Sequence, residues 1–376
     1  MSRLPSPRNG ETLIVNEQPV KYTYWPIKSR GKGRPSLQTQ IFTNDPLNVI
    51  ESSINQTCPR KRKEEAFSYL DQAKDYLSAI VYSRIIAAKP ILSYYAMLNI
   101  VKSYILTYGI QDNLGKIQHG IYESNSSNPH FSVDELKFLP SKRNNLSAFA
   151  ELYRLLTGVE LVTSKTVPVS NLFAQTILGH RLWCSAANQN ERFIQVARIQ
   201  YVHNAKDQEL WLRLYFYVDD LKALGITHQK LLTQGRFQND FQEIGIDEKE
   251  SGRQLISFEQ ITPVLSSKWP SDKLGELSCL IKNNLWNILL NAPPYRRFYA
   301  YIAPTSEHIF PQLISIYALA FYFGSITRYH PHKFKEILET DYGAYVREFI
   351  DYQIIQFLFL IAGEFSKRDV VKPSVI

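Results

Sequence analysis

The chain of 376 residues is poor in cysteine and contains no long apolar run. Its three cysteines, Cys58, Cys184 and Cys279, are far apart, which argues against a disulfide framework and fits a reducing compartment. The most apolar stretch, residues 354–362, is under half of the roughly 20 residues that a membrane span needs. The first ten residues contain no apolar segment of a signal peptide. We therefore expect a soluble, cytoplasmic protein with no membrane partner.

Motifs that bind phosphate or metal ions, or that carry a catalytic nucleophile, are also missing. The sequence has no glycine-rich phosphate loop, no GxSxG, no HExxH and no calcium-binding loop. Its aspartates are too scattered to indicate a nuclease metal site. We therefore expect no cofactor and no metal.

Positive charge is concentrated near the N-terminus. The net charge is +8, and residues 1–35 hold seven basic side chains against two acidic ones. A basic surface of this kind can contact the phosphates of nucleic acids. We name four candidates for nucleic-acid or anion binding: Lys28, Arg30, Lys32 and Arg34. The alternative is a solvated loop.

Apolar residues recur at helical spacing over several long segments. Helices are predicted over residues 64–87, 90–108, 272–291, 310–328 and 343–366, with a short helix starting at Pro331. The first two helices should form an antiparallel hairpin, because only a short link joins them. Since such apolar faces cannot be buried alone, we expect 64–87, 90–108, 310–328 and 343–366 to form one core.

Residues 209–218 show the best strand pattern, because aliphatic and phenylalanine side chains on one face alternate there with tryptophan, arginine and tyrosine side chains on the other. Together with residues 192–202 they predict a small antiparallel sheet. The second face contains Trp211, Arg213 and Tyr215, and aromatic rings interleaved with arginine can stack nucleic-acid bases. The alternative is that this face packs beneath a neighbouring helix.

The expected fold class is therefore mainly α, a helical bundle with a small antiparallel β insert. We expect a basic N-terminal region with a short hairpin over residues 1–63. A helical core should comprise 64–155 and 266–376, and the middle segment 156–265 should contain the sheet.

The break between the helices at Arg328 and Pro331 gathers basic side chains at one helix N-terminus, where an anion or phosphate would be stabilised. Arg328 and His332 are candidate catalytic residues, since arginine stabilises a charged phosphate and histidine transfers protons near neutral pH. His330 and Lys333 are candidate anion-binding residues. The alternative is a simple helix corner in which Arg328 caps carbonyl groups.

Three residues of the helix predicted over residues 90–108 stand at i, i+4 and i+7 and share one face. They are Tyr95, Asn99 and Lys102. We consider them candidates for lining a cleft against the Arg328 junction. The alternative is a core seam with a buried, hydrogen-bonded asparagine.

Two segments resemble the YaaC-like protein family. Residues 89–102, KPILSYYAMLNIVK, are similar to its PLLxYYxxLNLxKA helix, and residues 323–331, FGSITRYHP, to its S-hydrophobic-x-RYxP junction. The closing helix and residues 370–373 also follow the pattern. The resemblance implies a HEPN-like helical domain, whose relatives often accompany prokaryotic anti-phage defence genes. It implies no settled activity.

Three functions are consistent with these observations. We expect a non-catalytic binding or accessory component of a prokaryotic defence or nucleic-acid-associated system, with a protein partner encoded nearby. RNA or DNA is a further candidate ligand, and homo-oligomerisation is left open. The first alternative is a HEPN-like, metal-independent ribonuclease using Arg328 and His332, although only three residues separate this pair. The second is a scaffold that contacts protein alone.

Overall fold

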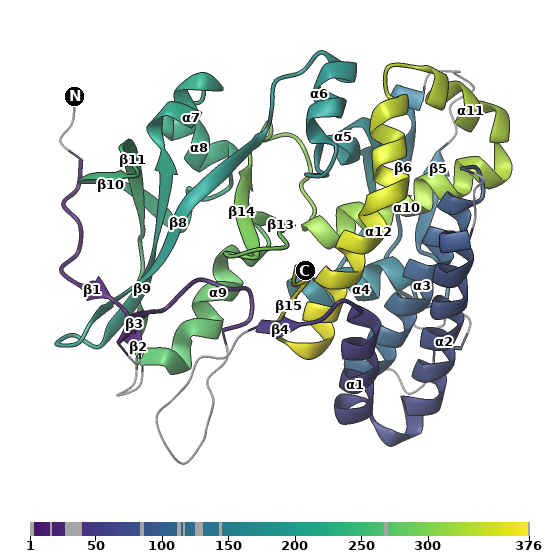
Figure 1. Ribbon diagram of the computed structural model, residues 1–376, viewed down its shortest axis with the longest axis horizontal. Coiled ribbons are helices and arrows are strands. Elements are labelled where there is room, and N and C mark those ends of the chain that lie inside the picture. Colours follow the sequence, from purple (N-terminus) through teal and green to yellow (C-terminus); the bar gives the residue numbers. More distant parts are fainter. Residues whose placement is uncertain are drawn as a thin grey trace. The chain divides into compact units, whose positions relative to one another are not determined.

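A computed structural model describes residues 4–15, 17–26, 40–82, 86–110, 114–115, 117–124, 131–142, 145–266 and 270–374. The chain divides into two compact units, and its path passes repeatedly from one to the other. Unit 1 comprises Met1–Asn44, Asn190–Glu307 and Lys367–Ile376. Unit 2 comprises Asp45–Gln189 and His308–Ser366. The labels used below are those of Figure 1.

Unit 1 is built on an eight-stranded antiparallel sheet (Figure 1). Six strands follow the order β10-β11-β9-β8-β14-β13, while β1 pairs with β8 and β12 pairs with β9. The strands are β1 (Glu11–Thr12), β8 (Phe193–Asn204), β9 (Glu209–Tyr217), β10 (Phe241–Glu250), β11 (Arg253–Gln260), β12 (Val264–Leu265), β13 (Leu285–Leu289) and β14 (Arg296–Tyr301).

Strands β8 and β9 confirm the predicted strand pair. They pair antiparallel, with Val202 opposite Trp211 and Asn204 opposite Glu209. The alternation along β9 places Leu212 and Leu214 in the apolar core of unit 1. Helix α9 (Leu274–Lys282) contributes Leu277 to the same core. The pattern of period two thus directs one face of β9 into the core.

Short elements complete unit 1. Strands β2 (Ile14–Val15) and β3 (Gln18–Pro19) form a small antiparallel hairpin. Strand β4 (Gln40–Phe42) pairs in parallel with β15 (Asp369–Val371), and Nη2 of Arg296 donates to the carbonyl of Val370 at 2.8 Å. The remaining helical segments are α7 (Val218–Ala223), α8 (His228–Gln234) and the 3-10 turn Pro270–Lys273.

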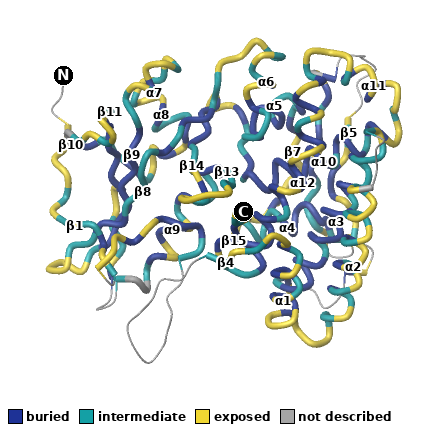
Figure 2. The backbone as a smooth tube through the Cα atoms, in the orientation of Figure 1, coloured by how far each residue is buried: buried dark blue, intermediate teal, exposed yellow. Residues whose placement is uncertain are grey.

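Unit 2 is mainly helical. Helix α3 is its centre, contacting α2, α4, α10 and α12, and α3, α10 and α12 are largely buried in Figure 2. This confirms the helical core expected from the apolar periodicity. The helices are α1 (Pro46–Thr57), α2 (Arg60–Tyr82), α3 (Lys89–Tyr108), α4 (Ala148–Thr157), α5 (Val169–Ala174), α6 (His180–Ala187), α10 (Gln312–Tyr329), α11 (Pro331–Glu339) and α12 (Gly343–Ser366).

Helix α12 is the single helix of the described chain that is long and apolar enough to cross a membrane. However, 72% of its most apolar window is buried inside the structure. Its apolar surface packs against α1, α3, α10 and α11. The apolar composition of α12 is therefore explained by its position as a core helix of unit 2.

A three-stranded antiparallel sheet also belongs to unit 2. Its strands are β5 (Ile121–Ser124), β6 (Glu135–Phe138) and β7 (Lys165–Pro168), with a 3-10 turn at Phe131–Val133. Strand β5 contacts helix α10. None of these three strands is among the elements predicted from the sequence.

The predicted fold class, a mainly α bundle with a small β insert, is wrong. Unit 1 contains an eight-stranded sheet, and three smaller sheets accompany it in the described residues. Part of the error is the helix expected over residues 272–291. Helix α9 ends at Lys282, and Leu285–Leu289 forms strand β13 paired with β14. A short apolar run fits a buried strand as well as a helix, so periodicity alone could not separate them.

Candidate functional site

The helix break predicted near Arg328 is present. Helix α10 ends at Tyr329, helix α11 begins at Pro331, and His330 lies between them. Proline favours the first position of a helix, where its missing N–H costs nothing. Because α10 stops here, the side chains of Arg328, Tyr329 and His330 reach the wall of a pocket.

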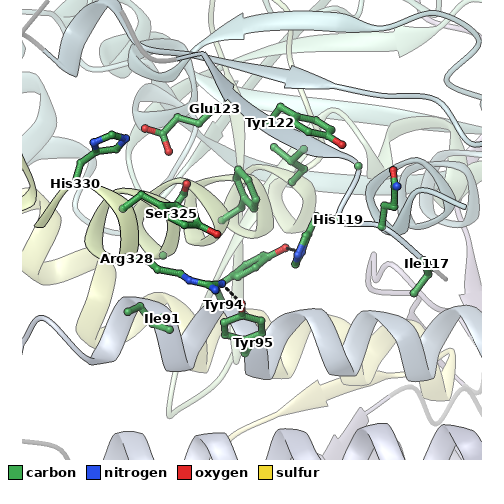
Figure 3. A pocket seen from close by; sticks show the side chains of 16 residues that line it. Ile91, Tyr94, Tyr95, Ile117, His119, Tyr122, Glu123, Ser325, Arg328 and His330 are labelled. Atoms are coloured by element: carbon green, nitrogen blue, oxygen red, sulfur yellow. Dashed lines mark hydrogen bonds between the residues drawn. The ribbon is translucent and has the colours of Figure 1, made fainter. Parts of the chain in front are cut away.

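The pocket has a volume of about 600 Å³ and lies wholly within unit 2 (Figure 3). Helices α3 and α10 form two of its walls, and the chain from residue 117 into β5 forms another. This size is typical of small-molecule sites. The lining residues are Ile91, Tyr94, Tyr95, residues 117–123, Phe321, Gly324, Ser325, Arg328, Tyr329 and His330.

Arg328 is the cation of this pocket with the clearest geometry. Its Nη1 donates a hydrogen bond to the hydroxyl of Tyr95 at 2.7 Å (Figure 3). Its guanidinium carbon lies 5.0 Å from the centre of the Tyr329 ring. Among the described residues it forms no ion pair, and it caps no helix carbonyl. The alternative of Arg328 as a helix cap is therefore wrong, and its charge is available to a ligand.

His119 stands on the opposite side of the pocket from Glu123 and His330 in Figure 3. Its Nδ1 shares a hydrogen bond with the hydroxyl of Tyr94. Burial lowers the pKa of His119, and the charges of Lys102 and Arg328 lower it further. The imidazole is therefore neutral at pH 7, when one ring nitrogen donates and the other accepts.

Glu123 lies on β5 and carries the acidic group of this site. Its Oε1 is buried without a hydrogen-bond partner among the described residues. Burial raises the pKa of Glu123, Asp134 adds to this, and a hydrogen bond with Ser325 and the charges of His330 and Lys333 oppose it. This carboxyl therefore takes up a proton at a higher pH than an exposed glutamate does.

The three residues predicted to line a cleft lie along a second, smaller pocket. Tyr95, Asn99 and Lys102 line this cavity of about 250 Å³ together with Gln72 and Tyr76 of α2. Asn99 is buried, and its Nδ2 donates to Oε1 of Gln72 at 2.7 Å. These residues therefore form a core seam with a hydrogen-bonded asparagine, and the same seam also lines a cavity.

The candidate catalytic pair is not brought into one cavity. His332 is exposed, its ring lies 6.2 Å from that of His330, and it is not among the residues that line the pocket. Arg328 faces the pocket from the end of α10, whereas His332 belongs to α11. The geometry therefore gives no support for proton transfer by His332 to a ligand bound at Arg328.

Lys333 is not a free anion-binding residue. It is buried, and its Nζ lies 2.7 Å from Oδ1 of the fully buried Asp134. The hydroxyl of Tyr322 donates to Oδ2 of Asp134 at 2.7 Å. The charge of Lys333 is thus neutralised inside the core.

The aromatic face of β9 is also buried. Trp211 and Arg213 both donate to Oε2 of Glu259, at 2.9 and 2.7 Å, and Arg198 covers the ring of Tyr215 at 4.0 Å. The prediction that Trp211, Arg213 and Tyr215 stack bases is therefore wrong, because these rings have no exposed face. The tail residue Arg8, rather than a neighbouring helix, donates its backbone N–H to Glu259 at 3.0 Å.

The basic candidates Lys28, Arg30, Lys32 and Arg34 lie outside the described residues. Within the described part of the chain, no group of three or more histidine, cysteine, aspartate or glutamate side chains could hold a metal ion.

Sequence reasoning missed His119, Glu123 and Ser325 as pocket residues. The available signal was the alternation at residues 121–124 and 135–138, which indicates two short strands. It was obscured by the surrounding polar sequence. Only packing against α3 and α10 shows that these strands bring His119 and Glu123 to Arg328.

Together these observations define an α+β protein of two units, with a polar, aromatic-lined pocket in the helical unit. The sequence profile of the YaaC-like protein family matches residues 36–365, and the chain belongs to this family. The match extends well beyond the two segments that carried the resemblance. We found no match among curated proteins and none among solved structures.

Proposed function

We propose that the pocket of unit 2 binds a ligand that carries a phosphate and an aromatic ring, such as a nucleotide. The observation that carries this proposal is the state of Arg328. Its guanidinium is held at the wall by Tyr95, and no carboxylate in the described residues pairs with it. An arginine fork can bind a phosphate through two parallel hydrogen bonds.

The other polar groups are compatible with an anion. His330 is half-buried and lines the same wall, so its imidazole adds a polar group beside Arg328. Glu123 would repel an anion if it were ionised. Burial raises the pKa of Glu123, so the neutral carboxyl, which does not repel an anion, persists to a higher pH than that of an exposed glutamate.

The aromatic lining supports the second part of the ligand. Tyr95, Tyr122 and Phe321 line the pocket, and Tyr122 is 50% exposed. Stacking of a base on an aromatic side chain contributes about 1–3 kcal/mol. A nucleotide therefore matches both the charge and the rings of this pocket.

We further propose that the protein is a non-catalytic, cytoplasmic component of a prokaryotic anti-phage defence or other nucleic-acid-associated system. Membership of the YaaC-like family, the basic N-terminal region and the lack of a catalytic motif support this role. A protein encoded nearby is the expected partner.

The test is calorimetric titration of the full chain with adenosine monophosphate at low and high salt. We expect saturable binding that weakens with salt, because charged contacts are screened. Arg328→Met should weaken it by about tenfold to a hundredfold, as for the loss of hydrogen bonds to a charged group. Lys137→Met removes an exposed charge on β6 and should have no effect. Absence of binding at low salt would contradict the proposal and favour the protein-only scaffold.

One observation favours an enzyme as the second candidate. The neutral imidazole of His119 lies close enough to Arg328 for that charge to lower its pKa, so it could act as a base. The measurement is cleavage of single-stranded RNA in the presence of EDTA. We expect no cleavage. EDTA-resistant cleavage that is lost in a folded His119→Ala variant would favour a metal-independent ribonuclease.

A further inference from the structure

The two pockets of unit 2 share one wall. Tyr95, Ile117, Gln118 and His119 line both cavities. The larger cavity extends from this wall towards Arg328 and His330, and the smaller one extends towards Lys102. The two cavities therefore adjoin along these four residues, and we refer to them together as the groove.

Three successive contacts join the antiparallel helices α2 and α3 beside the smaller pocket. The rings of Tyr76 and Tyr95 are 5.8 Å apart. Next along the helices, Asn99 donates to Gln72 at 2.7 Å. Last, Nζ of Lys102 lies 4.9 Å from the centre of the Tyr69 ring. Each contact fixes a side chain at the level of its own helical turn.

The groove therefore has a cation near each end. Arg328 is held at the level of Tyr95, and Lys102 stands seven residues further along α3. Seven residues of α-helix span about 10 Å. The two cations are thus attached at different levels of the groove, and a ligand with two anionic groups can accept one charge-assisted hydrogen bond from each.

Neither cation is neutralised within the protein. Lys102 and Arg328 form no ion pair among the described residues, although Glu65 is near enough to Lys102 to interact with it at longer range. Lys102 is partly buried, and burial lowers its pKa because the ammonium is less hydrated there. A bound anion would replace the lost contacts.

His119 connects the two ends electrostatically. It lines both cavities, and the charges of Lys102 and Arg328 both act on its ring. Both cations therefore lie within electrostatic range of the wall that the two cavities share.

We propose that the groove binds a linear ligand with two anionic groups, namely a dinucleotide that carries a terminal phosphate and an internal phosphodiester. One anionic group lies at Arg328 and the other at Lys102. This inference rests on the proposed nucleotide site and extends it by a second subsite. Between the two cations, Asn99 Oδ1 can accept and the Gln72 amide can donate, which suits the edge of a base.

The experiment compares adenosine monophosphate with terminally phosphorylated diadenylate on four full-length proteins: the natural chain, Lys102→Met, Arg328→Met and the control Lys137→Met. The natural chain should bind the dinucleotide at least about tenfold more tightly, which corresponds to about 1.4 kcal/mol. Lys102→Met should remove this advantage and leave the affinity for the mononucleotide within about twofold, since one lost charged contact costs about tenfold. Arg328→Met should weaken both ligands.

Each other outcome has a defined meaning. Equal affinities of the natural chain for the two ligands would overturn the second subsite while leaving the nucleotide site intact. So would a Lys102→Met variant that keeps the full dinucleotide advantage. If Lys102→Met instead weakens the mononucleotide, the assignment of the two anions to their ends is wrong. If neither ligand binds the natural chain, the nucleotide site itself fails. Melting temperatures of all variants identify any loss of folding.

Discussion

Nη1 of Arg328 and the hydroxyl of Tyr95 are joined by a 2.7 Å hydrogen bond that links the end of α10 to the middle of α3. Tyr95 also belongs to the cavity that leads to Lys102. One phenol thus positions the guanidinium and lines both cavities of the groove.

Replacing Tyr95 by phenylalanine tests this positioning role. The ring remains, but the acceptor for Arg328 is lost. We expect nucleotide affinity to fall by roughly threefold to tenfold, in line with about 0.5–1.5 kcal/mol for one hydrogen bond. Calorimetry measures the change, with Tyr352→Phe on the exposed face of α12 as the control. An unchanged affinity would show that Arg328 needs no support from Tyr95.

Lys333→Met tests the assignment of that lysine to the core. The buried carboxylate of Asp134 would lose its cationic partner, which costs about 3–5 kcal/mol for a buried ion pair. The melting temperature should therefore fall clearly, and the double variant Asp134→Asn/Lys333→Met should recover part of the loss. Thermal unfolding followed by circular dichroism measures this. A variant with normal stability but weak nucleotide binding would instead indicate that Lys333 binds the anion.

Glu123→Gln tests the buried carboxyl. The pKa of Glu123 is raised above its usual value of 4.5, so the folded state holds the proton more tightly than the unfolded state. Linkage then makes its contribution to stability most favourable below pH 4.5, and that contribution is lost as pH rises through the raised pKa.

The amide cannot ionise. Glu123→Gln should therefore raise the melting temperature relative to the natural chain at pH 7, and the difference should shrink as the pH approaches 4.5. Calorimetric scans at several pH values measure it, with the exposed Glu336→Gln as the control. A difference that stays constant with pH would show that the charge of Glu123 is not the cause.

Glu259→Gln tests the buried face of β9. The carboxylate accepts hydrogen bonds from Trp211, Arg213 and the backbone of Arg8. Without its charge, Arg213 is left as a buried cation, and we expect unit 1 to lose about 3–5 kcal/mol of stability. Tryptophan fluorescence during urea unfolding measures this. An unchanged unfolding midpoint would mean that Arg213 finds another partner.

The sequence predicted those elements whose periodicity is long. The four helices of the unit 2 core and the β8–β9 pair extend over enough residues for the apolar pattern to identify them. Strand β13 has five residues and β5 has four, and runs this short fit more than one structure.

The site was predicted in part for the same reason. Arg328 stands out because the helix break at Pro331 is a local signal. His119 meets Tyr94 only after β5 packs beside α10, and the partner of Lys333 is Asp134, far away in the sequence. Contacts between distant segments leave no local pattern, so neither could be read from spacing.

The parallel pairing of β4 with β15 has a consequence for biosynthesis. Gln40 leaves the ribosome long before its strand partner Asp369. The intervening chain passes from one unit to the other and back, so neither unit is complete before Ser366 has been synthesised. Such long separations slow folding and leave strand edges exposed meanwhile. Chaperone protection during synthesis is therefore expected, and separately expressed halves should not yield either unit in folded form.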